Sequence, residues 1–286
     1  MFARAFVLLQ YLLPRHALTA LVYRLARVRT RFVKDALIKG FNRLYDVDLA
    51  EVDARVPEDF ASFNEFFTRP LREGARPIDA DPGTIVSPVD GTVSAAGTLS
   101  GETLLQAKGI DYSLDDLFAI DLADARAFAD GSFATIYLAP YNYHRVHMPV
   151  DGELVAAHYV PGDLFSVNDA TAANIRGLFA RNERLNLHFR TDFGPAAVIF
   201  VGALNVGSIS TPWTGEIRPR KSGVVESLEF PEHSRFCKKG DLLGWFNLGS
   251  TVIVVLPKGA GEWSDELRHG HRVLKGRPIG RLATAT

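Results

Sequence analysis

From Ile85 to the C-terminal end, the chain is a succession of short apolar segments separated by turn residues. Asp90-Gly91 and Asp151-Gly152 are dipeptides typical of tight turns. The strand-like segments are 133–139, 152–160, 184–189, 196–209 and 242–256. Short strands joined by tight turns predict a β-rich domain with mostly antiparallel pairing. Within the last segment, the β-branched run 251–255 predicts a buried strand.

Helical patterns stand on either side of this β pattern. Residues 114–131 predict a helix within the β-rich part, with Ser113 placed to cap it and Gly131 to end it. Residues 60–79 begin with a helix-like pattern and contain two prolines, which predicts a connector. We therefore expect an α+β protein with a helical region at 1–45, a helical connector at 46–80 and a β-rich domain at 81–286.

The first 45 residues carry a net charge of +8, although the whole chain has a formal charge of −1. An apolar stripe runs through them at helical spacing, with three arginines off it: Leu18, Leu21, Val22, Leu25 and Val28, against Arg24, Arg27 and Arg31. A basic segment of this kind is typical of binding to an anionic partner. The apolar stripe favours a membrane surface over nucleic acid.

This segment is too short to cross a membrane. Its longest stretch without charge, 5–14, falls far below the roughly 18–20 apolar residues that a spanning helix needs. Pro14 would also break or kink a helix there. We expect the segment to lie on the membrane. Two other interpretations stay open: a helix packed on its own domain with solvated arginines, and an Arg-rich organelle presequence.

Composition limits the remaining choices. The 286 residues, 47% of them hydrophobic and 23% charged, suit one large folded domain or two small ones. Cys237 is the only cysteine, which excludes an internal disulfide framework and a multi-cysteine zinc site, and it fits a reducing compartment.

The segment YNYHRVHMP (141–149) contains two histidines three residues apart, His144 and His147. In a turn or a helix their side chains converge, whereas in a strand they point to opposite faces. Without an HExxH pattern and without nearby cysteine or acidic ligands, no metal site is expected here. The pair is a candidate for acid–base chemistry, and a purely structural role is the alternative.

Two further segments could supply partners for these histidines. In SPVDGTV (87–93), Asp90 is either part of a hairpin turn or a carboxylate that orients a histidine. Ser250 follows Gly249 directly before the predicted buried strand. The segment lacks the G-x-S-x-G elbow and leads into a strand, which argues against a common serine hydrolase and leaves another use for the serine.

At these residues the chain resembles a known family. Leu248-Gly249-Ser250-Thr251 is similar to the self-cleavage motif of the pyruvoyl-dependent phosphatidylserine decarboxylase proenzymes. Further segments resemble that family in the same order: 63–79, 87–93, 104–114, 143–152, 159–168, 178–184 and 240–251. The basic N-terminal segment is similar to the membrane-attachment region of its short, bacterial-type members.

The resemblance implies a reaction sequence. The hydroxyl of Ser250 would attack the carbonyl of Gly249, with His147 as the base and Asp90 orienting it. β-Elimination would then split the precursor into a β chain, 1–249, and an α chain, 250–286, whose first residue becomes a pyruvoyl cofactor. A Schiff base between the pyruvoyl group and the phosphatidylserine amine would accept the electrons released as CO₂ leaves. His144 would act on the substrate side and in protonation.

The resemblance also implies partners. Residues Leu164, Phe165, Ser166 and Asn168 would line the headgroup and lipid entrance. The protein would be a homodimer, bound peripherally to anionic phospholipid on the cytoplasmic face of the cell membrane, with no nucleic-acid partner. A β-rich carrier module remains the alternative from another class, because SPVDGTV and KKGDLLGWFNLG resemble the hairpins of lipoyl-type domains.

Overall fold

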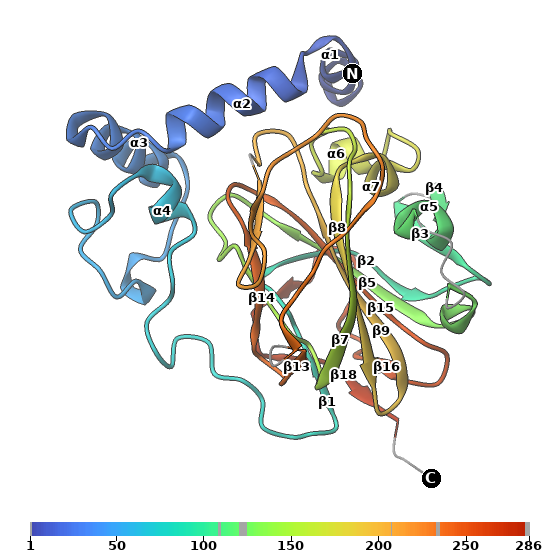
Figure 1. Ribbon diagram of the computed structural model, residues 1–286. Coiled ribbons are helices and arrows are strands. Elements are labelled where there is room, and N and C mark those ends of the chain that lie inside the picture. Colours follow the sequence, from blue (N-terminus) through green and yellow to red (C-terminus); the bar gives the residue numbers. More distant parts are fainter. Residues whose placement is uncertain (1, 108–109, 120–124, 207, 233–234, 284–286) are drawn as a thin grey trace.

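The computed structural model describes residues 2–107, 110–119, 125–206, 208–232 and 235–283 (Figure 1). It confirms the α+β class, with helices at the N-terminal side and a β-rich remainder. The N-terminal helices are α1 (Phe2–Leu12), α2 (Arg15–Ala26), α3 (Arg31–Leu44) and α4 (Phe63–Phe67), with the 3₁₀ turn η1 (Leu49–Glu51). In Figure 1, α1 and α2 lie across one end of the β-rich part, and β1 and β18 lie near the other.

Pro14 separates α1 from α2, as predicted. Proline lacks the N–H that a continuing helix would need, so the chain turns at this residue. Over the residues that the structure describes, there is no helix with the length and apolar character required to span a bilayer.

The core of the molecule is a nine-stranded antiparallel sheet. Its strand order is β12 (Glu226–Ser227), β7 (Gly152–Val160), β8 (Arg184–Thr191), β9 (Gly194–Val201), β15 (Ser250–Leu256), β5 (Ser132–Leu138), β2 (Gly91–Thr98) and β17 (Arg272–Val273), with β13 (Phe236–Cys237) also paired to β7. The predicted strands 133–139 and 152–160 correspond to β5 and β7 within one residue. Antiparallel pairing is therefore confirmed.

Three smaller sheets complete the β-rich part. A four-stranded sheet has the order β11 (Gly215–Ile217), β10 (Ile209–Thr211), β14 (Leu242–Phe246) and β6 (Arg145–His147). A three-stranded sheet contains β1 (Thr84–Val86), β18 (Pro278–Leu282) and β16 (Gly261–Trp263), and β3 (Thr103–Ala107) pairs with β4 (Ile110–Ser113). Strand β14 of the four-stranded sheet leads within four residues into β15 of the main sheet. The two sheets therefore meet at the segment 247–249.

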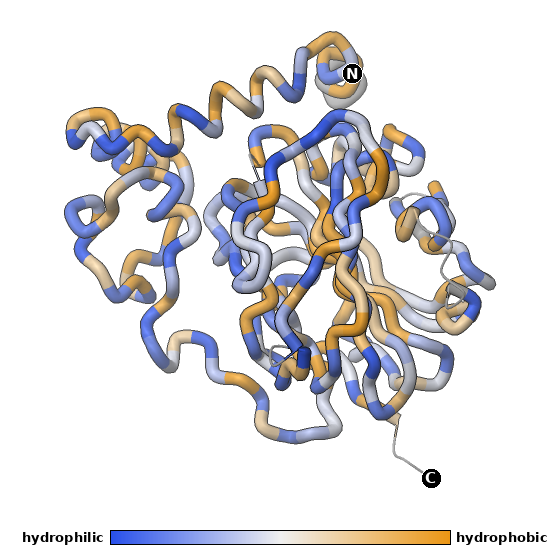
Figure 2. The backbone as a smooth tube through the Cα atoms, in the orientation of Figure 1, coloured by the Kyte–Doolittle hydropathy of each residue, from blue (hydrophilic) through white to orange (hydrophobic). Residues whose placement is uncertain are grey.

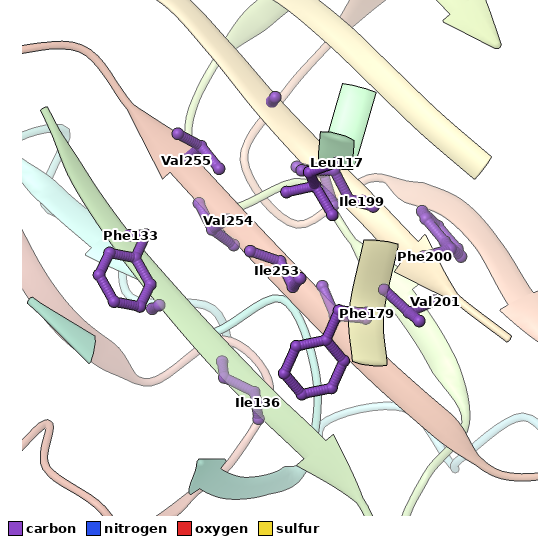
Figure 3. Packing of buried hydrophobic residues seen from close by; sticks show 14 of the residues in the cluster. Leu117, Phe133, Ile136, Phe179, Ile199, Phe200, Val201, Ile253, Val254 and Val255 are labelled. Atoms are coloured by element: carbon purple, nitrogen blue, oxygen red, sulfur yellow. The ribbon is translucent and has the colours of Figure 1, made fainter. Parts of the chain in front are cut away.

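Strand β15 lies at the centre of the main sheet, and all seven of its residues are buried. It pairs with β5 on one side and β9 on the other. Figure 3 shows Ile253, Val254 and Val255 packed among side chains of those neighbours. Each such apolar side chain contributes about 1.5–3 kcal/mol when fully buried. The predicted buried strand at 251–255 is confirmed.

The helix predicted over 114–131 is wrong in its length. Helix α5 spans only Leu114–Phe118, and the 3₁₀ turn η2 (Ala125–Phe128) follows, with 120–124 outside the described residues. Ser113 caps α5 as predicted, since its side chain accepts a hydrogen bond from the Asp116 N–H. The early end has a tertiary cause: side chains of β8, Arg184 and Asn186, donate to the last carbonyls of α5.

Two short helices follow β7, α6 (Asp169–Ala172) and α7 (Leu178–Arg181). Phe179 of α7 and Leu117 of α5 pack over the main sheet (Figure 3). Helix α1 packs against α6, which joins the N-terminal helices to the β-rich part.

Candidate active site

Ser250 is the first residue of β15 and lies opposite Leu138 of β5. Its side chain is buried, and its Oγ has no hydrogen-bond partner within the described part of the chain. An unpartnered buried hydroxyl costs about 1–3 kcal/mol in proteins, so its retention needs an explanation. Gly249 before it has φ of +22°, a left-handed conformation that strains any residue with a Cβ.

His147 lies on β6 and is held by two hydrogen bonds. Its Nδ1 is 2.8 Å from the Gly240 carbonyl oxygen and its Nε2 is 3.1 Å from the Tyr143 hydroxyl. Because a carbonyl can only accept, Nδ1 carries the proton and Nε2 presents its lone pair. Burial, reinforced by the charge of Lys275, lowers the pKa of His147 to about 3. The neutral imidazole is therefore in a form that accepts a proton at Nε2.

His144 lies in the turn before β6 and is almost fully buried. Its ring stacks on Phe67 of α4 at a centroid distance of 4.1 Å. Its Nε2 donates to the Pro140 carbonyl at 3.3 Å, and its Nδ1 has no partner among the described residues. Burial lowers the pKa of His144 to about 3. This histidine too is neutral, with one free lone pair.

Among the described residues, no hydrogen bond joins Asp90 to His147, and the orienting role expected of Asp90 stays a prediction. The Asp90 carboxylate is buried and accepts hydrogen bonds from Arg76 and from the Lys275 N–H, the latter at 2.8 Å. A carboxylate without its own countercharge is costly to bury, and Arg76 supplies that charge. Glu51 pairs with the same guanidinium. Lys275 neighbours both residues: its backbone N–H binds Asp90, and its charge acts on His147.

The histidine pair is connected to the cleavage motif through neighbouring residues. The Phe246 N–H donates to the His144 carbonyl at 3.1 Å, four residues before Ser250. Leu248 packs with Phe67, the residue that stacks on His144. The fold thus brings both histidines onto elements adjacent to 248–250, and no hydrogen bond joins either imidazole to Ser250 within the described residues.

A cavity of about 390 Å³ opens beside this site. Asp90 and Tyr143 line it, together with Arg69, whose buried Nε has no partner in the described chain. Burial lowers the pKa of Arg69 to about 10. In the same described residues, no group of three or more His, Cys, Asp or Glu side chains could hold a metal ion.

The segment predicted to line the lipid entrance, 162–168, contacts the N-terminal helices. Leu164 and Phe165 are fully buried, and the role of the segment at a lipid entrance stays a prediction. Ser166 N–H donates to Gln10 of α1, and Asn168 caps α6. Two more contacts tie the segment to the helices: Arg15 pairs with Asp163 at 2.7 Å, and its guanidinium covers the Phe165 ring.

Several residues of the site were not predicted from the sequence. Arg76, Phe67 and Lys275 contact Asp90 or His144 from segments distant in the chain. No periodicity marks them, because each acts through tertiary contacts. Tyr143 stood in the histidine segment, but its bond to His147 Nε2 depends on the turn geometry.

Comparison with known proteins was consistent across the chain. A family model described as phosphatidylserine decarboxylase matches residues 63–281, and a second, described as PSD, matches residues 5–46. A protein of Psychrobacter cryohalolentis, named phosphatidylserine decarboxylase proenzyme, is 49% identical over 280 residues, covering 98% of this chain and 99% of the relative. Proteins with the same name are 50% identical in Psychrobacter arcticus, covering 95% and 96%, and 45% identical in Methylococcus capsulatus, covering 97% and 96%.

Proposed function

The chain belongs to the phosphatidylserine decarboxylase family, and on this premise we propose that it converts phosphatidylserine to phosphatidylethanolamine and CO₂. We further propose that the catalytic group is a pyruvoyl group derived from Ser250. When present, that group supplies a carbonyl that binds the substrate amine and accepts electrons as CO₂ leaves. The observation that best supports this proposal is the buried, unpartnered Ser250 hydroxyl directly after the left-handed Gly249.

Formation of that group begins within the chain. The Ser250 Oγ attacks the Gly249 carbonyl, so that an ester bond forms and the peptide bond to the Ser250 nitrogen breaks. Elimination then removes the Cα proton of residue 250, forms a double bond between Cα and Cβ and breaks the bond between Oγ and Cβ, which releases residues 1–249 with a free carboxylate. Water then adds to the remaining unsaturated residue 250, and its nitrogen leaves as ammonia. Gly249 suits the acyl position because its backbone tolerates the strained conformation.

His147 is the proposed base for the Ser250 hydroxyl. Its Nδ1–H is fixed on the Gly240 carbonyl, and its Nε2 lone pair is free to accept once the Tyr143 hydroxyl moves away. Such proton transfer typically contributes 10²–10⁴-fold, an order-of-magnitude range. Asp90 would act on His147 indirectly, by fixing the Lys275 segment whose charge faces the imidazole.

His144 is the proposed proton donor to the carbon that loses CO₂. The substrate amine arrives as an ammonium and loses a proton when it binds; the unpartnered Nδ1 of the neutral His144 would take up that proton and pass it to the carbon. Burial against Phe67 lowers the pKa of His144 to about 3, which favours this release. The same packing excludes water from the ring, which limits competing protonation.

The N-terminal helices are proposed to bind the membrane surface peripherally. Leu12 is 83% exposed and Phe32 86% exposed, and Leu21 and Leu25 of the predicted stripe also face solvent. Figure 2 shows hydrophobic residues recurring along α1 and α2 among hydrophilic ones. Arginines between them would attract the anionic lipids of the cytoplasmic leaflet, at about 1 kcal/mol each. The implied homodimer stays a prediction.

Self-cleavage is tested by replacing Ser250 with Ala. We expect the unchanged protein to give two bands on a denaturing gel, with a blocked N-terminus on the smaller one by mass spectrometry. The Ser250→Ala variant should give one full-length band and no CO₂ release from phosphatidylserine. Cleavage at the same bond in that variant would refute the mechanism.

Membrane binding is tested by co-sedimentation with vesicles of anionic phospholipid. Leu12→Glu combined with Phe32→Glu should weaken binding at least about tenfold. Each substitution replaces an apolar side chain that would enter the bilayer by a carboxylate that the bilayer disfavours. Phe236→Glu, at the exposed β13 away from α1, makes the same kind of change as a control. Equal losses in both variants would contradict the assignment of α1–α3 as the binding region.

A further inference from the structure

Asn247, two residues before Gly249, is held by several hydrogen bonds. It is buried, and its Nδ2 donates to Ser208 Oγ at 2.7 Å and to Ser210 Oγ at 3.0 Å. Its backbone N–H donates to the Ser208 carbonyl at 3.0 Å. Its backbone carbonyl accepts from Asn64 Nδ2 of α4 at 2.7 Å. Every polar group of Asn247 except the side-chain oxygen thus has a close partner.

This residue is one of two fixed points around Gly249. On the far side, Ser250 and Thr251 are held in β15, which pairs with strands on both edges. Between the fixed points, Leu248 packs against Phe67 and Ala26, and Gly249 has φ of +22°. A residue between two anchored neighbours cannot change its conformation by moving its ends. The anchors therefore hold the Gly249 carbonyl in place relative to the Ser250 hydroxyl.

A directed chain of hydrogen bonds extends from Asn247 to helix α2. Asn247 Nδ2 donates to Ser208 Oγ, and that hydroxyl donates to Glu216 Oε1 at 2.5 Å. The Arg27 guanidinium, at the C-terminal end of α2, pairs with the same carboxylate oxygen at 2.5 Å. In this series of hydrogen bonds each group has one role: because the Glu216 carboxylate can only accept, the Ser208 hydroxyl donates to it and accepts from Asn247. Arg27 and Glu216 thus fix the Ser208 rotamer that receives Asn247.

We propose that Asn247 is a positioning residue for self-cleavage, and that the Arg27–Glu216 pair acts through Ser208 to hold it. The inference rests on the proposed cleavage at Gly249–Ser250. Without the anchor, the peptide before Gly249 samples other conformations, and the Ser250 hydroxyl spends less time in line with the carbonyl. The region of the chain proposed to bind lipid then contributes to forming the catalytic group.

The test measures how fast newly made precursor splits. Precursor is produced by a short pulse of cell-free synthesis and chased on denaturing gels. Asn247→Asp keeps the size of the side chain but removes both donated hydrogen bonds, and should slow splitting at least about tenfold, as a modest loss of alignment does. Glu216→Gln should slow it less. Glu226→Gln breaks an exposed pair with Arg220 and should leave the rate unchanged.

A second measurement separates positioning from general stability. Hydroxylamine attacks esters, so its addition cleaves chains that have formed the ester between Ser250 and Gly249. A positioning role predicts less hydroxylamine-dependent cleavage in Asn247→Asp, at a temperature where near-UV circular dichroism shows it folded. If that variant fails to fold, Glu216→Gln carries the same test.

Wild-type rates of splitting and of hydroxylamine cleavage in folded Asn247→Asp and Glu216→Gln would overturn the inference. That result is distinct from failure of the proposed function, for which Ser250→Ala would itself split at the same bond.

Discussion

His188 provides a quantitative test of how this fold treats buried histidines. It lies on β8, where its ring packs edge-on against Phe118 at 4.9 Å. It is 7% exposed, and its Nε2 has no partner within the described residues. Burial, with a smaller contribution from His158, lowers its pKa from 6.5 to about 3. Replacing it with Leu removes the titrating group and keeps an apolar side chain in the core.

The magnitude follows from proton linkage. Between pH values of about 3 and about 6.5, the unfolded chain binds a proton on His188 that the folded chain excludes, so stability falls as the pH falls. Lowering the pH from about 7.5 to about 5.5 therefore costs about 1.4 kcal/mol of unfolding free energy for this one histidine. His144 and His147 act in the same direction. Glu183 acts in the opposite one, because burial raises its pKa from 4.5 to about 7.

The assay is urea unfolding at the two pH values in an uncleaved Ser250→Ala background, where a single chain unfolds. The difference in unfolding free energy between the two pH values should be about 1.4 kcal/mol smaller in His188→Leu than in the parent. The contributions of the other titrating groups are the same in both proteins and cancel. Ile253→Val serves as a control, costing about 1 kcal/mol at both pH values. An unchanged pH difference in His188→Leu would refute the conclusion that His188 is neutral in the folded protein.

Two other substitutions probe the site in the same background. Arg76→Gln should lower stability by about 3–5 kcal/mol in urea unfolding, because it leaves the buried Asp90 carboxylate without its countercharge; adding Asp90→Asn should recover part of the loss, and no recovery would argue against the pairing. Phe67→Ala should cost about 3–5 kcal/mol and raise the pKa of His144 from about 3 toward 6.5 in an NMR titration, since water then reaches the ring. Phe67→Leu keeps more of the cover and should shift the pKa less; an unmoved pKa in Phe67→Ala would show that another group keeps the ring neutral.

Sequence patterns predicted the structure correctly where the chemistry of a few neighbouring residues determines the local backbone conformation. The β-branched run at 251–255 became a buried strand, Pro14 ended a helix, and Ser113 capped one. In each case the deciding interaction lies within a few residues of the chain. The order of strands in the sheet carried no such signal, because β15 pairs with residues of β5 and β9 that lie fifty or more positions earlier in the chain.

Distant contacts explain the corrections. The helix expected to reach 131 ends at 118, where Arg184 and Asn186 bind its carbonyls from β8. Asp90 was expected to orient His147, but its carboxylate accepts hydrogen bonds from Arg76, because a buried charge is stabilised most by an opposite charge. A sequence pattern does not encode which of several charges reaches a buried group.

The sequence by itself determined the class of the fold, the break at Pro14, the buried strand after Ser250 and, through its motifs, the family. Only the tertiary structure decided how Ser250, His144 and His147 are surrounded: which imidazole nitrogen carries the proton, which ring covers His144, and which side chains hold Asn247 ahead of Gly249. Those properties depend on desolvation and on hydrogen bonds between segments far apart in the chain. They arise only when the two sheets and the N-terminal helices come together around residues 247–250.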